Sequence, residues 1–254
     1  MSAAGPGRLP PPPLLAPPRH ALFADLDGTL APIRPRPGDV RPDAERARVL
    51  DALSGALDGA VAVITGRALE DADRILEGRI AAIAAVHGLR RRNAAGIVLE
   101  AAAVPPPASV REAIAAFLAA HPALAAEDKG LAIALHYRAQ PSAAGACRTL
   151  ARRLAAEHGL GVQDGDMVVE LRAAGPTKGE AVEAFMAEPP FAGRTPVFIG
   201  DDLTDEHGFA GAERLGGHGV IVGPRRPTRA RFALDDVGAA LAWLAASAGL
   251  GPQP

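Results

Sequence analysis

The stretch Phe23-Ala24-Asp25-Leu26-Asp27-Gly28-Thr29-Leu30 decides the fold of this chain. An apolar run, residues 21–24, leads into two carboxylates placed two positions apart. The run predicts a short buried strand that ends before Gly28. In an extended chain, residues i and i+2 point to the same side. Asp25 and Asp27 should therefore leave the strand end together.

Two carboxylates held this close repel each other unless a cation or a shared proton lies between them. Gly28 lets the backbone turn sharply, and Thr29 offers a hydroxyl just beyond the turn. The pattern suits a nucleophilic Asp25 beside an acid/base Asp27, with a divalent metal joining them to a phosphate. The alternative is a polar turn after a strand, in which the two aspartates cap the next segment.

The composition is that of an ordinary globular protein, with 254 residues, 48% apolar and 22% charged. This length allows one large domain, or a core with a smaller inserted unit. The net charge of −2 argues against a nucleic-acid partner, which would need a basic excess on one face. Cys147 is the only cysteine, so neither a disulfide framework nor a four-cysteine zinc site is expected.

Residues 1–19 are rich in proline, which predicts a disordered tail. A proline-rich ligand for a partner domain is the alternative. The tail has no basic start followed by an apolar stretch, so it does not resemble a signal peptide. No apolar run reaches the length of a membrane span, so no membrane partner is expected. The cytoplasm is the expected location, and a monomer is the working expectation.

Apolar runs and helical patterns alternate in two parts of the chain. This alternation predicts an α/β fold with a Rossmann-like, doubly wound parallel sheet. Ligands of such sheets bind at the carboxyl ends of the strands, where Asp25, Thr65 and His87 fall. The predicted strands are 21–24, 60–64, 80–86, 196–199 and 220–222, and the predicted helices are 43–57, 68–76, 179–186, 203–212 and 237–246, the last with Trp243 buried.

The rhythm changes between about residues 90 and 175, where strands follow strands. This change predicts a separate α+β unit. It contains a hairpin at 89–100, helices at 109–120 and 142–158, and strands at 131–137, 161–163 and 167–171. The predicted domains are the tail at 1–19, a discontinuous core at 20–100 and 175–254, and an inserted unit at 101–174.

Two further polar residues stand where a phosphate could bind. Thr65 ends the second strand before Gly66, where a hydroxyl and a free backbone N–H can hold a phosphate oxygen. Its alternative role is a helix N-cap. Lys178 precedes a helix, which is slightly unfavourable with the helix dipole, and its ammonium could neutralise a carboxylate and a phosphate. The alternative is a solvated surface lysine.

An acidic cluster follows the strand at 196–199 and so lies at the same predicted sheet edge. The segment reads Gly200-Asp201-Asp202-Leu203-Thr204-Asp205-Glu206. Hard oxygen ligands on a turn suit Mg²⁺, which binds through a few carboxylates together with phosphate. Asp205 or Glu206 could equally complement a helix dipole. Four acids in six residues favour the metal site.

These motifs, taken in order, resemble the four motifs of the haloacid-dehalogenase-like phosphatases. The inserted unit resembles their C2-type cap. Within that superfamily, four segments resemble the trehalose-6-phosphate phosphatase family: Glu127-Asp128-Lys129-Gly130, His136-Tyr137-Arg138, Val168-Val169-Glu170-Leu171-Arg172 and the acidic segment 200–206. The resemblance covers nearly everything from residue 21 to residue 222.

The resemblance implies hydrolysis of trehalose 6-phosphate to trehalose and phosphate, as in trehalose biosynthesis. Asp25 would attack phosphorus and form an aspartyl-phosphate. Asp27 would protonate the sugar alkoxide and later activate water. Thr65 and Lys178 would clamp the transferring phosphoryl group, since this reaction needs positioning and charge neutralisation.

The resemblance also implies a Mg²⁺ cofactor and a sugar site. Mg²⁺ would be held by Asp25, the Asp27 carbonyl and Asp201, with Gly28, Thr29, Asp202 and Asp205 in support. The predicted substrate-binding residues are Arg67, His87, Glu127, Lys129, Arg138 and Glu170. Carboxylates can accept several hydroxyl hydrogen bonds from an uncharged disaccharide. The alternatives are a surface ion pair between Glu127 and Lys129 and a purely structural His87.

The chain departs from the family pattern in a few positions, and none of them removes a catalytic group. Ala173 stands where the family commonly has proline, and Thr65 where serine is frequent. His207-Gly208 replaces an acid and a larger residue, and Gly208 is expected to loosen the helix start. Two other functions stay open: another capped phosphatase, acting on sucrose phosphate or a hexose phosphate, and a non-catalytic sugar-phosphate sensor.

Overall fold

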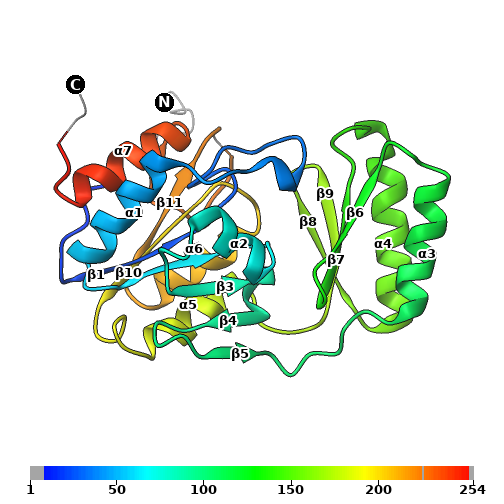
Figure 1. Ribbon diagram of the computed structural model, residues 1–254, viewed down its shortest axis with the longest axis horizontal. Helices are drawn as coiled ribbons and strands as arrows, with labels where there is room; N and C mark the ends of the chain where they lie inside the picture. The colour runs from blue at the N-terminus through cyan, green and yellow to red at the C-terminus, as the bar shows by residue number, and fades with distance from the viewer. Residues whose placement is uncertain (1–8, 225, 252–254) are drawn as a thin grey trace, which may run out of the picture.

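The computed structural model describes residues 9–224 and 226–251. In this part of the chain, eight strands form one sheet in the order β12-β11-β10-β1-β2-β3-β4-β5 (Figure 1). The strands are β1 (His20–Ala24), β2 (Val61–Ile64), β3 (Ala82–Ala85), β4 (Arg90–Arg92), β5 (Val98–Glu100), β10 (Thr195–Gly200), β11 (His218–Val222) and β12 (Phe232–Leu234).

The strands from β12 to β3 are parallel, and β4 and β5 join antiparallel at one edge. The central strands are short apolar runs buried along their length, as strands covered on both faces should be. The order runs from β1 to β2 and β3 on one side and from β1 to β10, β11 and β12 on the other. The strand order therefore reverses between β1 and β10, which is where such sheets bind ligands. The predicted α/β fold with a doubly wound parallel sheet is confirmed.

Helices cover the parallel sheet, with α5 packed against α6 and α1 against α7. Trp243 of α7 is buried, as predicted. Gly208 of α6 has a packing reason, because a Cβ there would lie 2.4 Å from the Phe198 ring. The helices are α1 (Ala44–Ala56), α2 (Leu69–Leu76), α5 (Lys178–Met186), α6 (Asp205–Arg214) and α7 (Val237–Ser247).

A second sheet, antiparallel and in the order β6-β7-β9-β8, lies beside the first (Figure 1). One of its faces is covered by α3 and α4, and together they enclose a separate apolar core. The elements are α3 (Ala108–Ala119), β6 (Ala125–Asp128), β7 (Ala132–His136), α4 (Ala144–His158), β8 (Gly161–Gly165) and β9 (Val168–Arg172). We call this unit the cap. We propose residues 20–100 with 175–254 and residues 101–174 as the boundaries of the two domains.

Two strands were not predicted from the sequence. The strand β6 has the sequence Ala-Ala-Glu-Asp, which offers neither an apolar run nor a β-branched residue. It forms because each of its residues pairs with β7. The strand β12 has three residues, Phe-Ala-Leu, which were not recognised as a separate apolar run.

The prediction of a disordered tail is wrong for residues 9–19. Leu15 is buried in the main core, and its N–H donates to the Ser247 hydroxyl at 3.1 Å. The carbonyl of Pro13 accepts from Trp243 Nε1 at 3.0 Å, and that of Pro10 from the N–H of Ala233 at 3.0 Å. Proline lacks a donor but keeps its carbonyl, so such a segment can pack without regular structure. Residues 1–8 lie outside the described residues.

The helices in the described part of the chain can be compared with what a membrane span requires. None of them combines the length and the apolar character that crossing a bilayer requires.

Candidate active site

The first two acidic motifs meet because the strands that precede them are neighbours. Strands β1 and β10 pair in parallel with Ala24 opposite Ile199, and the N–H of Asp25 donates to the Ile199 carbonyl at 2.9 Å. Asp25 follows β1 directly and Asp201 follows β10 directly. Both carboxylates therefore stand at the point where the strand order reverses.

Lys178 begins α5 and points into this acidic edge. Its Nζ donates to Asp25 Oδ1 at 2.8 Å and to Asp205 Oδ1 at 2.6 Å, and its side chain is 3% exposed. The alternative of a solvated surface lysine is therefore wrong. Burial acts to lower the pKa of Lys178, but the two carboxylates outweigh burial and raise it. The ammonium stays charged in the site.

Asp205 holds the acidic turn in place from the first turn of α6. Its Oδ1 accepts from Lys178, and its Oδ2 accepts from the N–H groups of Asp201 and Asp202, each at 2.9 Å. Both oxygens of this buried carboxylate are thus in use. The carboxylate fixes the turn and the ammonium rather than serving chiefly as a helix-dipole complement.

The site fits a divalent cation. One carboxylate oxygen from each of Asp25, Asp201 and Asp205 lies within 4.8 Å of the others, and of the three Asp205 is already bound to Lys178 and to the turn. Gly28, at a φ of +82°, makes room, because a Cβ there would lie 2.0 Å from Asp201 Oδ2. Thr29 Oγ1 donates to Asp201 Oδ1 at 3.4 Å. Hard carboxylate oxygens suit Mg²⁺.

The pKa shifts of the carboxylates in the site also favour a bound cation. Burial raises the pKa of Asp25 to about 7, against the opposing charge of Lys178. Burial, followed by the charge of Asp25, raises the pKa of Asp201 to about 9. A buried and a half-buried carboxylate that disfavour each other's ionisation form an environment that a cation would relieve.

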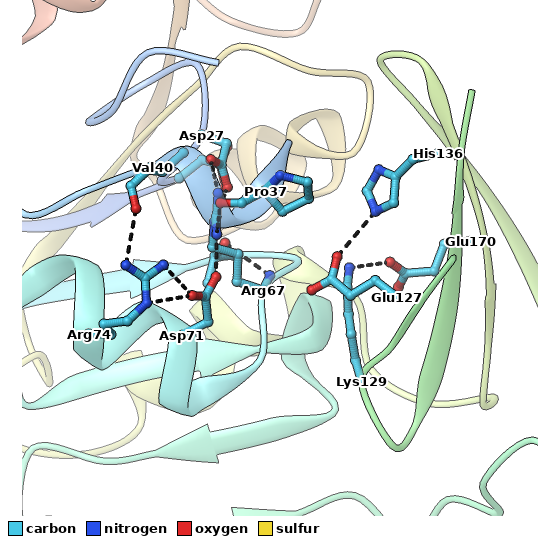
Figure 2. Close-up of polar contacts among 12 residues, drawn as sticks. Asp27, Pro37, Val40, Arg67, Asp71, Arg74, Glu127, Lys129, His136 and Glu170 are labelled. Carbon is cyan, nitrogen blue, oxygen red and sulfur yellow. Dashed lines mark hydrogen bonds and ion pairs between the residues drawn. The ribbon is translucent and has the colours of Figure 1, made fainter. Parts of the chain in front are cut away.

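Asp27 is paired with Arg67, which the sequence placed among the substrate-binding residues. Arg67 donates from Nε to Asp27 Oδ2 at 2.6 Å and from Nη2 to Asp27 Oδ1 at 2.7 Å (Figure 2). Its Nη1 donates to the Pro37 carbonyl and to Asp71. Nε, Nη1 and Nη2 of this buried guanidinium are thus all engaged within the protein.

Thr65 lies at the end of β2 and is buried. Its Oγ1 accepts from the N–H of Arg67 at 3.2 Å, so its hydroxyl proton stays available for a phosphate oxygen. The alternative of an N-cap for α2 is wrong, because Ala68 occupies that position.

The cap presents polar side chains toward the acidic edge of the main sheet. They do not form the pair between Glu127 and Lys129 that the sequence left open. Lys129 Nζ donates to Glu170 Oε2 at 2.7 Å, and Glu127 Oε2 lies 3.2 Å from His136 Nε2 (Figure 2). A surface pair between Glu127 and Lys129 is therefore not formed. Lys129 and Glu170 are both buried, with side chains 8% and 5% exposed.

His87 connects the core edge to the cap. Its Nε2 lies 3.7 Å from Glu170 Oε1, and burial lowers its pKa well below the usual value. Gly66 allows this approach, since a Cβ there would lie 2.5 Å from His87 Nε2. Within the described residues, Nδ1 of His87 and Oε1 of Glu170 are buried without a hydrogen-bond partner.

Arg138 lies at the cap rim, where its Nη2 donates to Asp166 Oδ2 at 2.5 Å. A single cavity between core and cap brings together most of the predicted site residues. Those lining it are Asp25, Asp27, Thr65, Arg67, His87, Glu127, Lys129, Arg138, Glu170, Lys178, Asp201 and Asp202.

Sequence reasoning did not assign several other residues that line the cavity. The polar ones among them are Arg34, His136, Gln163, Asp166 and Thr204. The strand register explains Gln163, because Glu127, Ala134, Glu170 and Gln163 stand opposite one another across the cap sheet. Residues paired in this way point to the same face. Correct pairing of the cap strands would have placed Gln163 beside Glu170.

Known proteins resemble this chain in both sequence and fold. A sequence model of the trehalose-phosphatase family matches residues 23–237. The chain is 42% identical over 230 residues to trehalose-6-phosphate phosphatase of Escherichia coli (strain K12), covering 89% of this chain and 85% of that protein. It is 40% identical over 214 residues to a probable trehalose-phosphate phosphatase of Sinorhizobium fredii, covering 82% and 79%.

A solved structure, the C-terminal domain of C. albicans trehalose-6-phosphate phosphatase, has a TM-score of 0.82 at 24% identity. The superposition covers 92% of this chain and 93% of that domain, and it shows that the two have the same fold. The chain therefore belongs to the trehalose-phosphatase family, a family of phosphatase enzymes with the haloacid-dehalogenase-like fold.

Proposed function

We propose that this chain is a Mg²⁺-dependent phosphatase that hydrolyses trehalose 6-phosphate to trehalose and phosphate through an aspartyl-phosphate on Asp25. One observation carries the proposal. The buried Asp25 carboxylate is held by Lys178 at 2.8 Å, and the cavity it lines also holds Asp201 and the polar face of the cap. The name of the Escherichia coli relative supports the substrate.

In the first step, a carboxylate oxygen of Asp25 bonds to phosphorus. The ester P–O bond breaks, and the sugar oxygen leaves with the electron pair and takes a proton from Asp27. In the second step, Asp27 accepts a proton from water, and the water oxygen bonds to phosphorus. The aspartyl P–O bond then breaks, and phosphate leaves.

The charges of the phosphoryl group need partners throughout. Lys178 and the Thr65 hydroxyl would hold its oxygens, and the helix start at Lys178 adds its dipole. A Mg²⁺ held by Asp25, the Asp27 carbonyl and Asp201, with Asp202 in support, would neutralise developing negative charge. Asp205 would keep the ammonium and the acidic turn aligned.

The sugar would lie against the cap. Glu127, Lys129 and Glu170 offer charged hydrogen-bonding groups, and His87 lines the same cavity from the core side. Arg138 would reach the sugar from the rim. The cap would exclude bulk water during phosphoryl transfer. The proposal includes a cytoplasmic enzyme, acting as a monomer, with no nucleic-acid or membrane partner.

Phosphate release over a panel of sugar phosphates, with Mg²⁺ and with chelator, tests the proposal. We expect a strong preference for trehalose 6-phosphate that chelator abolishes. Broad activity on hexose phosphates or sucrose phosphate would keep the reaction and reject the substrate. No release from any compound would favour a non-catalytic sensor, although the described site retains each predicted catalytic group.

A further inference from the structure

Arg67 is held at both ends of its guanidinium (Figure 2). One edge, Nε and Nη2, is bound to the two oxygens of Asp27 at 2.6 and 2.7 Å. At the other end, Nη1 is bound to Asp71 and, at 3.0 Å, to the Pro37 carbonyl. The guanidinium is planar and rigid, so whatever fixes Nη1 also fixes the plane in which Asp27 is held.

Asp71 lies in the first turn of α2, four residues after Arg67. One of its oxygens accepts from Arg67, and the other accepts from Arg74 Nε at 3.1 Å and Nη2 at 2.5 Å. Arg74 in turn donates to the Val40 carbonyl at 3.1 Å. Asp71 thus joins α2, the loop before α1 and Arg67 into one network.

Asp71 is not among the residues that line the cavity. Its influence on the site therefore passes through its two arginine partners: Arg67, which binds Asp27, and Arg74, which binds the loop before α1. Its charge matters as well, because burial acts to lower the pKa of Arg67 while Asp27 and Asp71 raise it. The carboxylates of Asp27 and Asp71 both neutralise the buried guanidinium of Arg67, so Asp27 does not carry that role alone.

We propose that Asp71 is a positioning residue: it fixes Arg67, which in turn holds Asp27 beside the leaving sugar oxygen. When Asp27 carries a proton, one of its oxygens stays bound to Arg67, and the other, released from the guanidinium, donates that proton to the sugar oxygen. This inference rests on the proposed function, in which Asp27 is the general acid. General acid catalysis matters most when the leaving group is a poor one, such as a sugar alkoxide. An aryl oxide with a low pKa, such as p-nitrophenolate, leaves without a proton. Misplacement of Asp27 should therefore affect the two kinds of ester differently.

The experiment compares Asp71→Asn with the wild-type enzyme on trehalose 6-phosphate and on p-nitrophenyl phosphate. The quantity measured is kcat/KM, which reports the steps up to the first irreversible one. The ratio of the two kcat/KM values does not depend on how much of the variant is folded. Asp51→Asn is the matched control, because Asp51 makes a similar Asp–Arg pair with Arg79 at the surface, away from the cavity.

For Asp71→Asn we expect kcat/KM on the sugar ester to fall about 10- to 100-fold, since small misplacements of reacting groups cost this much. On the aryl ester we expect a change of less than about threefold, because that leaving group needs no proton. Asp71→Glu keeps the charge and should recover part of the ratio. Asp51→Asn should keep the wild-type ratio.

An unchanged ratio in Asp71→Asn would overturn the positioning role, whether both activities fall together or neither falls. A wild-type protein that releases phosphate from neither ester would overturn the proposed function and the positioning role with it. The two failures are thus distinguished by the activity of the wild-type protein.

Discussion

At Gly28 the two acidic motifs approach each other closely. Replacement by alanine would place a Cβ 2.0 Å from Asp201 Oδ2, at a φ of +82°. We expect Gly28→Ala to weaken Mg²⁺ activation at least about tenfold, because the carboxylate must move away from its ligand position. The measurement is phosphate release as a function of Mg²⁺ concentration.

Gly78→Ala is the matched control. Gly78 has a similar φ of +68°, but a Cβ there would meet nothing within 4 Å. Both variants share the cost of a left-handed alanine, of the order of 1 kcal/mol. Only the Gly28 variant meets a carboxylate. Equal Mg²⁺ dependence in the two variants would contradict the close approach of Gly28 and Asp201 as a requirement of the metal site.

At the residue scale, the sequence predicted where the site residues lie better than it predicted which side chains pair with each other. Asp25, Thr65 and Asp201 could be located because parallel strands end at a common edge and an apolar run shows where each strand ends. The pairing of Lys129 with Glu170 could not be, since 41 positions separate the two residues and strand register joins them. The bidentate pair of Arg67 with Asp27 likewise depends on how the turn after β2 folds back.

At the scale of elements, the cap strands carry the sugar specificity in the proposed function. We expect Glu127→Ala and Glu170→Ala each to lower kcat/KM for trehalose 6-phosphate at least about tenfold, because each removes a carboxylate that would accept sugar hydroxyls. On p-nitrophenyl phosphate, which carries no sugar, the change should be less than about threefold. The measurement is steady-state kinetics on both esters.

Glu112→Ala serves as the control for the cap, because Glu112 is exposed on α3, outside the residues that line the cavity. It should leave both activities at their wild-type values. If the Glu127 and Glu170 variants also keep the wild-type kcat/KM for trehalose 6-phosphate, the substrate assignment is wrong.

The segment before β1 acts as an element of the fold although it has no regular structure. Leu15 is 5% exposed and packs in the main core. We expect Leu15→Ala to lower the free energy of unfolding by about 2–4 kcal/mol, the usual cost of a large-to-small change in a core. The measurement is equilibrium unfolding in urea.

Leu14→Ala offers the matched comparison, because Leu14 is the preceding residue and is 55% exposed. It should change the free energy of unfolding by less than about 0.5 kcal/mol. Similar small effects in both variants would show that the segment does not stabilise the core.

The elements that the sequence missed share a physical cause. Helices such as α1 and α5 could be predicted from spacing and from the residues at their starts, because those signals are local. The strand β6 and the segment 9–19 are held by contacts with other parts of the chain rather than by a local pattern. The strand β6 pairs with β7, the next strand, and the segment is bound by the distant residues Trp243 and Ser247. Proline content predicted the absence of helix and strand there, but not the packing.

At the scale of the whole molecule, the stability should depend on pH through His218 at the start of β11. Burial lowers the pKa of His218 to about 4, with smaller contributions from His20 and Arg231. The unfolded chain has an ordinary histidine pKa of about 6.5, so between these values it binds more protons than the folded protein. The contribution of His218 is therefore complete above about pH 6.5 and is lost as the pH falls toward 4.

The loss should be on the order of 1–2 kcal/mol, allowing for the part of the ring that water reaches. It is measured as the difference in pH dependence of urea unfolding between the wild type and His218→Gln, since the variant cannot take up this proton. Identical pH profiles for the two proteins would contradict the assignment.

The central claim is that Asp25 is the nucleophile that takes up the phosphoryl group. The most direct measurement is acid quenching of a single turnover with trehalose 6-phosphate labelled in its phosphate group. The wild-type protein should carry acid-stable label on Asp25, and Asp25→Asn should carry none and release no phosphate, because an amide cannot form the aspartyl-phosphate. Phosphate release by Asp25→Asn at the wild-type rate, with no label on either protein, would contradict the account.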